Sequence, residues 1–417
     1  MSGARRQAAG RVVNFMQNTI LHIDMDSFFA ACEQQRRPEL RGRAIGIADV
    51  KSRSVVAAAS YEAKRFGVKS AMRIPDALKL CPAIIFVKGD HHYYAEISQI
   101  SQRVFSRYGV AFERTSIDEG FLDATLTAPR YGGVEKLVAQ IKQDLALAVG
   151  DYITCSVGAA WTKTIAKWAS DRQKPNGLTI VDPTTWPALA PTIKLNEFCG
   201  IGRATTAKLA RYGLGTLADL QQISAERLRL LFGQQGEWLY ILAQGRGSDF
   251  VKRDVDQPPQ KSLGHAETFD RDLEYPAAYS AIRLMATTLG SRLRRHQLAG
   301  ATLTLTIRYR DFSTYSFRAP LGGPTHNDFI ITKAGRRLLE RVAHKQMLIR
   351  LLGLTLSDLS EAQTLTQSLF QEDRLTARLL AACDKISDRY GHHTIQPAVA
   401  LLNPNTRFDS GITWKRD

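Results

Sequence analysis

Two aspartates, Asp24 and Asp26, flank Met25 at the end of a strand-like segment near the start of the chain. Apolar and polar side chains alternate from Thr19 to Met25, which is typical of a half-buried strand, and residues 27–35 read as a helix. Both carboxylates therefore lie on one face of the strand, where the chain turns into the helix. Carboxylate oxygens are the ligands that Mg²⁺ prefers in proteins, so this spacing predicts a magnesium site.

Other interpretations of this acidic pair remain open. Asp26 can serve as the N-cap of the helix, with Asp24 alone as the metal ligand. Short acidic triplets also end strands in phosphatases with an aspartyl nucleophile and in metal-dependent glycosyltransferases. The residue Phe28 argues against the phosphatase, because a small hydroxyl or β-branched residue is expected at that position.

A second acidic pair, Asp118 and Glu119, lies in TSIDEGFLD between two apolar half-strands, residues 112–117 and 120–123. This pattern predicts a hairpin that can place the pair beside the first strand. Acidic residues on two strands of one sheet can hold two Mg²⁺ ions about 3.5–4 Å apart, which stabilises the attacking and leaving oxygens in phosphoryl transfer. Adjacent acids on a turn are also commonly just solvated, so the pair alone does not decide between the two interpretations.

Phosphate groups would have to be held by side chains, because the chain contains no GxxxxGK[ST] loop. Two basic segments supply candidates: SYEAKRFGVKSAM, which interleaves Tyr61 with Lys64, and AKWASDRQKPNG, which contains Lys174. Taken singly, each segment can equally be a solvated basic face.

The charge of the chain points to a polyanionic partner. Lys and Arg number 56 against 40 Asp and Glu, a net charge of +16. Half of this excess, 15 basic against 7 acidic residues, lies in residues 261–357, whereas residues 183–260 contribute only +2. Such an excess favours nucleic acid, and an acidic protein is also compatible with it.

The length and the cysteines limit the class of protein further. A chain of 417 residues predicts two to four domains, at about 100–200 residues each. Its five cysteines are widely spaced without a CxxC pair, and no segment has the composition of a membrane span or a secretory signal. We therefore expect reduced thiols, a cytoplasmic location and no membrane association.

Four segments together are much more specific than any one of them. HIDMDSFFAACE, SYEAKRFGVKSAM, SIDEGFLD and AKWASDRQKPNG occur in this order and at spacings that closely resemble the Y-family translesion DNA polymerases. From about Thr19 to Gly391 the chain is similar to the DNA polymerase IV branch of that family.

This resemblance implies a role for each matching residue. Asp24, Asp118 and Glu119 would bind two Mg²⁺ ions and act as the catalytic residues, with the Met25 carbonyl as a further ligand. Phe29 would be the steric gate, whose ring excludes a ribose 2′-hydroxyl. The incoming dNTP would be bound by Phe28, Phe29, Tyr61, Lys64 and Lys174. Most relatives carry Arg where this chain has Lys64, which removes a bidentate phosphate contact.

Two further matches lie outside this set. Gly200, Ile201 and Gly202 match a helix-hairpin-helix turn, whose backbone N–H groups can bind a DNA phosphate. The Pro that usually precedes this turn is Cys199 here. Leu369 and Phe370, within TQSLF, resemble the short peptide that docks on a sliding clamp, although most versions begin with Gln where this chain has Thr366.

The implied fold is a multidomain α/β right-hand polymerase. It has an α/β palm, small fingers, a helical thumb with a helix-hairpin-helix turn, and a split β-α-β little finger that binds DNA. The expected boundaries are a disordered extension over 1–13, the palm over 14–29 and 88–182, the fingers over 30–87, the thumb over 183–250, a linker over 251–260, the little finger over 261–358 and a tail with the clamp peptide over 359–417.

The implied activity is template-directed DNA synthesis, in which a primer 3′ end is extended with dNTPs by two-metal phosphoryl transfer and damaged template bases are bypassed with low fidelity. Primer-template DNA, dNTPs and a sliding clamp would be the partners of a monomeric enzyme. A catalytically silent DNA-binding accessory of damage tolerance is the alternative. The presence of Asp24, Asp118 and Glu119 argues against it.

Overall fold

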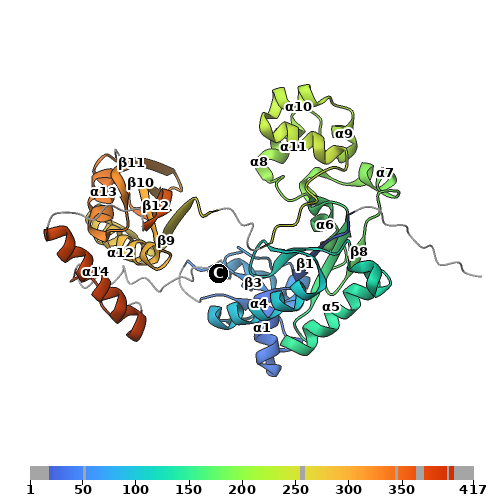
Figure 1. Cartoon of the computed structure of the whole chain (residues 1–417), viewed down its shortest axis with the longest axis horizontal. Helices are drawn as coiled ribbons and strands as arrows, with labels where there is room; N and C mark the ends of the chain where they lie inside the picture. The colour runs from blue at the N-terminus through green and yellow to red at the C-terminus, as the bar shows by residue number, and fades with distance from the viewer. Residues whose placement is uncertain are drawn as a thin grey trace, which may run out of the picture. The chain divides into compact units, whose positions relative to one another are not determined.

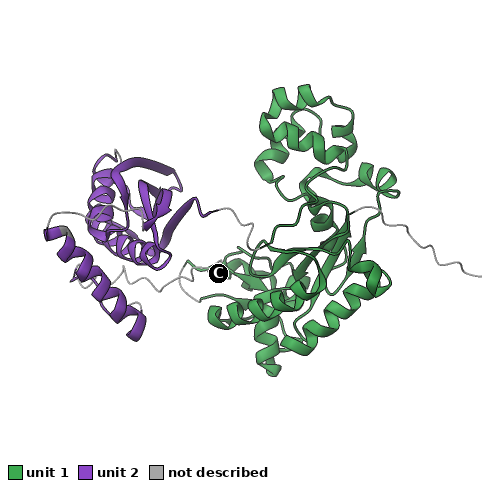
Figure 2. Cartoon of the chain, in the orientation of Figure 1, with its two compact units in different colours: residues 1–257 green, residues 258–417 purple. Residues whose placement is uncertain are grey.

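The computed structural model describes residues 18–49, 53–253, 259–342, 346–362, 371–391 and 394–398. The chain forms two compact units, residues 1–257 and residues 258–417 (Figure 2). The extension expected over residues 1–13 and the expected clamp peptide, including Leu369 and Phe370, lie outside the described residues.

Unit 1 is built around a five-stranded sheet in the order β5-β6-β1-β7-β8 (Figure 1). The central strand β1 pairs antiparallel with both of its neighbours, β6 and β7. The strands are β1 (Ile20–Met25), β5 (Phe112–Arg114), β6 (Glu119–Asp123), β7 (Cys155–Ala160) and β8 (Leu178–Ile180).

Helices cover both faces of this sheet. Leu21, Ile23 and Met25 pack into one core with α1 (Phe28–Arg36), α4 (His91–Phe105) and α5 (Val134–Val149). Ile20, on the other face, packs against α6 (Lys163–Ser170). The alternation in β1 is therefore real, but the prediction of a half-buried strand was wrong, because α6 buries the second face and leaves His22 fully inaccessible.

A smaller three-stranded sheet, in the order β3-β2-β4, follows α1 in the chain. It consists of β2 (Ile45–Ile47), β3 (Ala58–Ala59) and β4 (Ile85–Val87), with helices α2 (Tyr61–Arg65) and α3 (Ile74–Leu80). Ser60 accepts a hydrogen bond from the backbone N–H of Ala63 and so caps α2, which fixes the start of the helix that carries Tyr61 and Lys64. A single-turn 3₁₀ helix, Pro38–Leu40, precedes β2. Two others, Ser106–Tyr108 and Ala128–Tyr131, lie in the connections of the five-stranded sheet.

The last part of unit 1 is all-helical, as the sequence predicts. Its helices share a core with α6, in which large side chains such as Trp186, Phe198 and Leu239 are buried. A capping box between Thr216 and Asp219 begins α9. The α-helices are α7 (Trp186–Leu189), α8 (Arg203–Ala210), α9 (Leu217–Gln221), α10 (Ala225–Phe232) and α11 (Gln234–Ala243). Two 3₁₀ helices, Ala190–Thr192 and Leu195–Glu197, lie between α7 and α8.

Unit 2 is a four-stranded antiparallel sheet, in the order β11-β10-β12-β9, packed against α12 and α13. The chain runs β9 (Ser262–Leu273), α12 (Tyr275–Arg295), β10 (Leu298–Tyr309), β11 (Thr314–Thr325), α13 (Asp328–Glu340) and β12 (Ile349–Glu361). This order confirms the split β-α-β arrangement. The expected boundary at residues 358/359 falls inside β12, and a further helix, α14 (Gln371–Tyr390), follows.

Candidate active site

The two acidic pairs meet at the end of β1. Strand pairing sets Asp24 opposite Glu119, and the backbone N–H of Met25 donates a 2.9 Å hydrogen bond to the carbonyl oxygen of Asp118. The carboxylates are therefore brought together by antiparallel register between segments that lie far apart in the chain. This is the proximity that the hairpin prediction required.

Two lysines neutralise two of these carboxylates. Lys174 Nζ lies 2.7 Å from Asp24 Oδ1, and Lys167 forms an ion pair with Glu119. Asp118, in contrast, forms no ion pair within the described residues, and its carboxylate accepts a hydrogen bond from the hydroxyl of Ser116. The cluster thus contains one carboxylate without a cationic partner in the described part of the chain.

Burial and charge move the pKa values of the two paired acids in opposite directions. Burial, opposed by Lys174 but reinforced by Asp118 and Glu119, raises the pKa of Asp24 to about 6. Burial also acts to raise the pKa of Glu119, yet hydrogen bonds from His22 and Lys167 outweigh it and lower that pKa to about 2. The site therefore concentrates negative charge where water is partly excluded.

Asp26 does not cap α1, so the N-cap interpretation was wrong. Ser27 occupies the cap position and makes no side-chain cap hydrogen bond. The carboxylate of Asp26 is almost fully buried and accepts hydrogen bonds from four groups: the Tyr61 hydroxyl, the Thr154 hydroxyl, the Ser156 hydroxyl and the Asn176 backbone N–H. Asp26 thus links α2, β7 and the segment after Lys174, and has little remaining capacity to bind a ligand.

Tyr61, Lys64 and Lys174 lie beside the acidic cluster. Lys64 Nζ donates a 2.7 Å hydrogen bond to Ser27 Oγ and lies 4.5 Å from the centroid of the Tyr61 ring. Burial, together with the charge of Lys174, lowers the pKa of Lys64. The structure therefore gathers two cationic side chains and a tyrosine near Asp24, which is an arrangement suited to an anionic ligand.

The adjacent phenylalanines differ in exposure. Phe28 is 3% exposed and belongs to the core beneath the sheet. Phe29 is half-buried, and its ring stacks on Tyr94 with 4.6 Å between centroids and 14° between planes. Phe29 therefore presents a supported aromatic surface, whereas the Phe28 side chain is not accessible to a ligand.

Gly200, Ile201 and Gly202 lie apart from this cluster, before α8. Gly200 has φ +95°, a left-handed conformation that favours glycine, and Ile201 is buried. Gly202 is the N-cap residue of α8 and makes no side-chain cap hydrogen bond. Because glycine has no side chain, Gly202 cannot cap the first N–H groups of α8, and a backbone phosphate site requires such uncapped groups.

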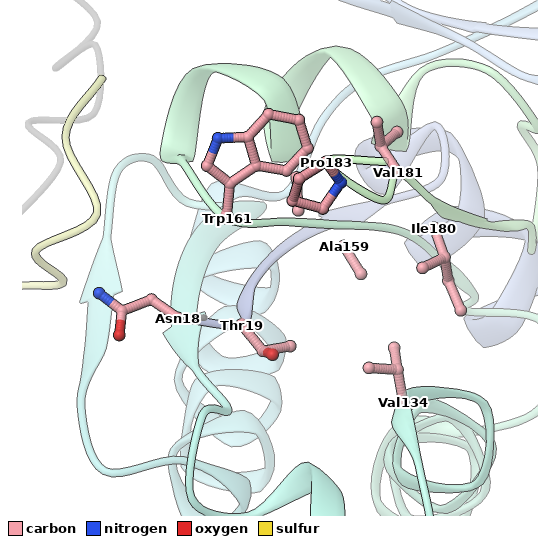
Figure 3. A pocket seen from close by; sticks show the side chains of 9 residues that line it. Asn18, Thr19, Val134, Ala159, Trp161, Ile180, Val181 and Pro183 are labelled. Atoms are coloured by element: carbon pink, nitrogen blue, oxygen red, sulfur yellow. The ribbon is translucent and has the colours of Figure 1, made fainter. Parts of the chain in front are cut away.

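A small apolar cavity lies near the start of β1, at the opposite end of the strand from Asp24 (Figure 3). Thr19, Val134 and Trp161 contribute to its lining. Its volume is about 10 Å³, which is close to the minimum for one water molecule. This cavity is too small to hold a nucleotide, so it is not a candidate for the nucleotide site.

Comparison with known proteins identifies the family. Residues 23–171 match the impB/mucB/samB family, residues 260–369 match the C-terminal domain of that family, and residues 196–249 match the thumb domain of DNA polymerase-iota. The chain is 34% identical over 393 residues to DNA polymerase IV of Desulfatibacillum aliphaticivorans, covering 93% of this chain and 98% of the relative. The chain belongs to the Y-family DNA polymerases, in the DNA polymerase IV branch.

Other relatives and solved structures agree with this assignment. DNA polymerase IV of Gluconobacter oxydans is 36% identical, covering 84% of this chain and 97% of the relative. A Y-family DNA polymerase chimera containing Dbh segments has the same fold, with a TM-score of 0.72 at 24% identity over 82% of this chain and 98% of that one. This polymerase is therefore a translesion DNA-directed DNA polymerase, and the right-hand fold predicted from its sequence is confirmed.

Membership of the Y family also implies a requirement for divalent metal. His22, Asp24 and Glu119 each place a potential ligand atom within 4.8 Å of the others. The predicted ligand Asp118 is not in this group, while His22 is in it and was not predicted.

In the described part of the chain no helix is long and apolar enough to cross a membrane.

Sequence reasoning overlooked the groups that hold Glu119. His22 Nε2 lies 3.4 Å from Glu119, and His22 Nδ1 lies 2.8 Å from the hydroxyl of Ser170. The alternation of β1 already placed His22 on the face of Asp24. Lys167 is part of the basic segment around Lys174, but its contact with Glu119 depends on how α6 packs across the sheet, which spacing alone does not specify.

Proposed function

We propose that Asp24, Asp118 and Glu119, with the Met25 carbonyl, hold two Mg²⁺ ions in the polymerase active site. The pairing of Asp24 with Glu119 across β1 and β6 carries this proposal. The donor set fits the ions, because it consists of oxygens and includes an Asp118 carboxylate without a cationic partner among the described residues. His22 is fully buried and engaged with Ser170, so we assign it to positioning Glu119.

Bound Mg²⁺ would supply neutralisation of charge on the attacking and leaving oxygens. The side chains of this chain would bind and select the nucleotide. Lys174, Lys64 and Tyr61 would bind the triphosphate, with Lys64 giving a single charged contact in place of an arginine fork. Phe29, held by its stacking on Tyr94, would close the space next to the sugar C2′ and exclude ribonucleotides. Phe28 would contribute to dNTP binding through its backbone, because its side chain is buried.

We assign the parts of the fold to the expected domains. The palm would comprise residues 14–29 and 88–182, and the fingers residues 30–87. Residues 183–250 would form the thumb, with Gly200, Ile201 and Gly202 binding a DNA phosphate. After a linker over 251–260, residues 261–358 would form the little finger on the DNA, followed by the tail over 359–417. The helical part of unit 1 and the sheet of unit 2 support this division.

The tail bears on a protein partner, and the cysteines bear on the cellular location. Leu369 and Phe370 would dock on a sliding clamp, which would keep a monomeric polymerase near its primer. The described cysteines are all free thiols, which supports a cytoplasmic location.

Primer extension on a defined template tests the two-metal assignment. Extension by the full chain should require added Mg²⁺ and should depend on its concentration with a cooperativity above one site. An enzyme that extends primers equally well in excess chelator would refute the assignment. A catalytically silent accessory would bind the primer-template without extending it under any metal condition.

A further inference from the structure

Helix α14 follows the sheet of unit 2 in the chain and belongs to that unit (Figure 2). Leu380 is 6% exposed, so this face of the helix is covered. Asp384 receives two hydrogen bonds from the Arg294 guanidinium, at 2.6 and 3.0 Å, and Asp388 pairs with Arg295. Arg294 and Arg295 lie at the end of α12. The acidic side chains of this helix face are therefore used in docking α14 onto its own domain.

A second face of α14 carries an apolar stripe that is exposed. Leu375 is 55%, Leu379 53%, Ile386 36% and Tyr390 64% exposed. With the exposed Ala382 between them, these residues follow one another at intervals of three and four, which places them in one row along the helix. Large apolar side chains in such a row are what an amphipathic helix buries against a partner. We call this row the α14 stripe.

A row of basic residues runs beside the α14 stripe. Each large member of the stripe is directly preceded by a basic residue, and these are Arg374, Arg378, Lys385 and Arg389. Successive residues are about 100° apart around a helix, so the four form a parallel row on one side of the stripe. The body of unit 2 lies on the other side. The outward surface of α14 is therefore both apolar and cationic.

We propose that the α14 stripe and its basic row form a second docking surface for the sliding clamp, adjacent to the Leu369-Phe370 peptide. This proposal rests on the clamp interaction proposed above. α14 begins at Gln371, the residue directly after Phe370. A protein that receives Phe370 must therefore lie next to the first turn of α14. The surface it offers should be an apolar groove with an acidic rim, which complements the stripe and the basic row.

Other occupants fit these features less well. A second copy of α14, packed stripe against stripe in antiparallel orientation, would bring two basic rows together, which is unfavourable. A membrane surface favours a broad apolar face, whereas this stripe is one residue wide between the basic row and unit 2. DNA phosphates would use the basic row but would leave Leu375, Leu379 and Ile386 exposed. A groove on an acidic protein satisfies both rows at once.

Titration of the purified cognate clamp into the full-length polymerase tests this proposal. Two variants alter the surface: Leu379→Ala/Ile386→Ala removes apolar side chains, and Arg378→Glu/Lys385→Glu reverses charge. Each should weaken clamp affinity by about tenfold or more, because central apolar and arginine contacts dominate interfaces. Arg130→Glu/Lys136→Glu is the matched control, with the same change of charge at exposed positions of unit 1, and should bind like the wild type. Thermal melts of every variant should match the wild type, since the substituted side chains point outward.

The outcomes separate this inference from the clamp proposal itself. If Leu369→Ala/Phe370→Ala loses the clamp while both α14 variants bind normally, the α14 surface is not part of the interface and the inference fails alone. If Leu369→Ala/Phe370→Ala keeps wild-type affinity, the clamp proposal fails. Sedimentation with phosphatidylcholine–phosphatidylserine vesicles, DNA binding and light scattering test the other occupants. An α14 variant that loses vesicle binding, DNA binding or self-association, but not clamp affinity, would overturn the inference.

Discussion

The ammonium group of Lys174 lies 2.7 Å from the carboxylate of Asp24. In our assignment Asp24 binds metal and Lys174 binds the triphosphate, so metal and nucleotide would compete with the ion pair. A second contact, from Lys174 to Asp171 at 3.0 Å, holds the lysine from the other side. Under this assignment, Lys174 would occupy the place of a cation beside Asp24 until metal and nucleotide are present together.

Replacing Lys174 by Met should have two opposite effects. The KM for dNTP should rise by about tenfold or more, because the variant cannot donate a charged hydrogen bond to phosphate. Affinity for Mn²⁺ without nucleotide should increase, because Asp24 no longer has a competing cation. Steady-state kinetics and Mn²⁺ binding followed by electron paramagnetic resonance measure the two effects. Unchanged Mn²⁺ affinity would show that Lys174 does not compete with metal.

Asp118→Ala should abolish primer extension without loss of DNA binding. The rate should fall by at least about 100-fold, since the variant loses a ligand of the metal ions that neutralise negative charge in the transition state. Primer-template affinity, measured by fluorescence anisotropy, should stay near that of the wild type. Glu135→Ala, at an exposed position on α5, is the control. Comparable activity of the two variants would contradict the two-metal assignment.

Phe29→Ala should relax selection against ribonucleotides. The ratio of ribonucleotide to deoxyribonucleotide kcat/KM should rise by about tenfold or more, because space opens where the aromatic ring stood. Phe66→Ala, which truncates a phenylalanine that is 57% exposed, should leave the ratio unchanged. An unaltered ratio in Phe29→Ala would place the gate at another residue.

Removal of unit 2, by ending the chain at Gln257, should weaken DNA binding to all sequences alike. The two units have separate hydrophobic cores, so unit 1 should remain folded. The slope of log K against log salt should fall by about 0.9 for each DNA phosphate that the shortened chain no longer neutralises. An equal slope for the truncated and complete chains would show that the basic residues of unit 2 do not bind DNA.

Thr366→Gln should strengthen clamp docking by about two- to tenfold, the range expected for one additional hydrogen bond. Intrinsic primer extension without the clamp should be unaffected. Titration of the clamp against the wild type and the variant measures the change. A variant with weaker or equal affinity would indicate that Thr366 does not occupy the position of the usual Gln.

The elements that surround the site could be predicted from sequence because their patterns are strong. β1, α1 and β6 correspond to the strand, helix and half-strand expected over residues 19–25, 27–35 and 120–123, and each buries several apolar side chains. β9 and β11 escaped prediction, and both are edge strands of the sheet in unit 2. An edge strand buries fewer side chains, and β11 also contains Pro320, Gly322 and Gly323, which weaken the strand pattern.

The candidate site was predictable as a set of residue types but not as a set of contacts. The acidic pairs and basic segments stand out in the sequence. The role of Asp26 does not, because its four donors come from distant segments and only the folded chain brings them together. The contact of Lys167 could not be predicted for the same reason, because Lys167 lies on α6 and its partner Glu119 lies on β6.

Arg294 forms ion pairs with carboxylates on two different helices. Besides Asp384 on α14, its guanidinium binds the buried carboxylate of Asp328 on α13, at 2.8 Å. A chain without α14 would therefore keep Arg294 paired and would leave no buried charge without a partner. The ion pairs that hold α14 are additional to this internal pair, so losing the helix would remove Asp384 and Asp388 as partners and leave the Arg294–Asp328 pair intact.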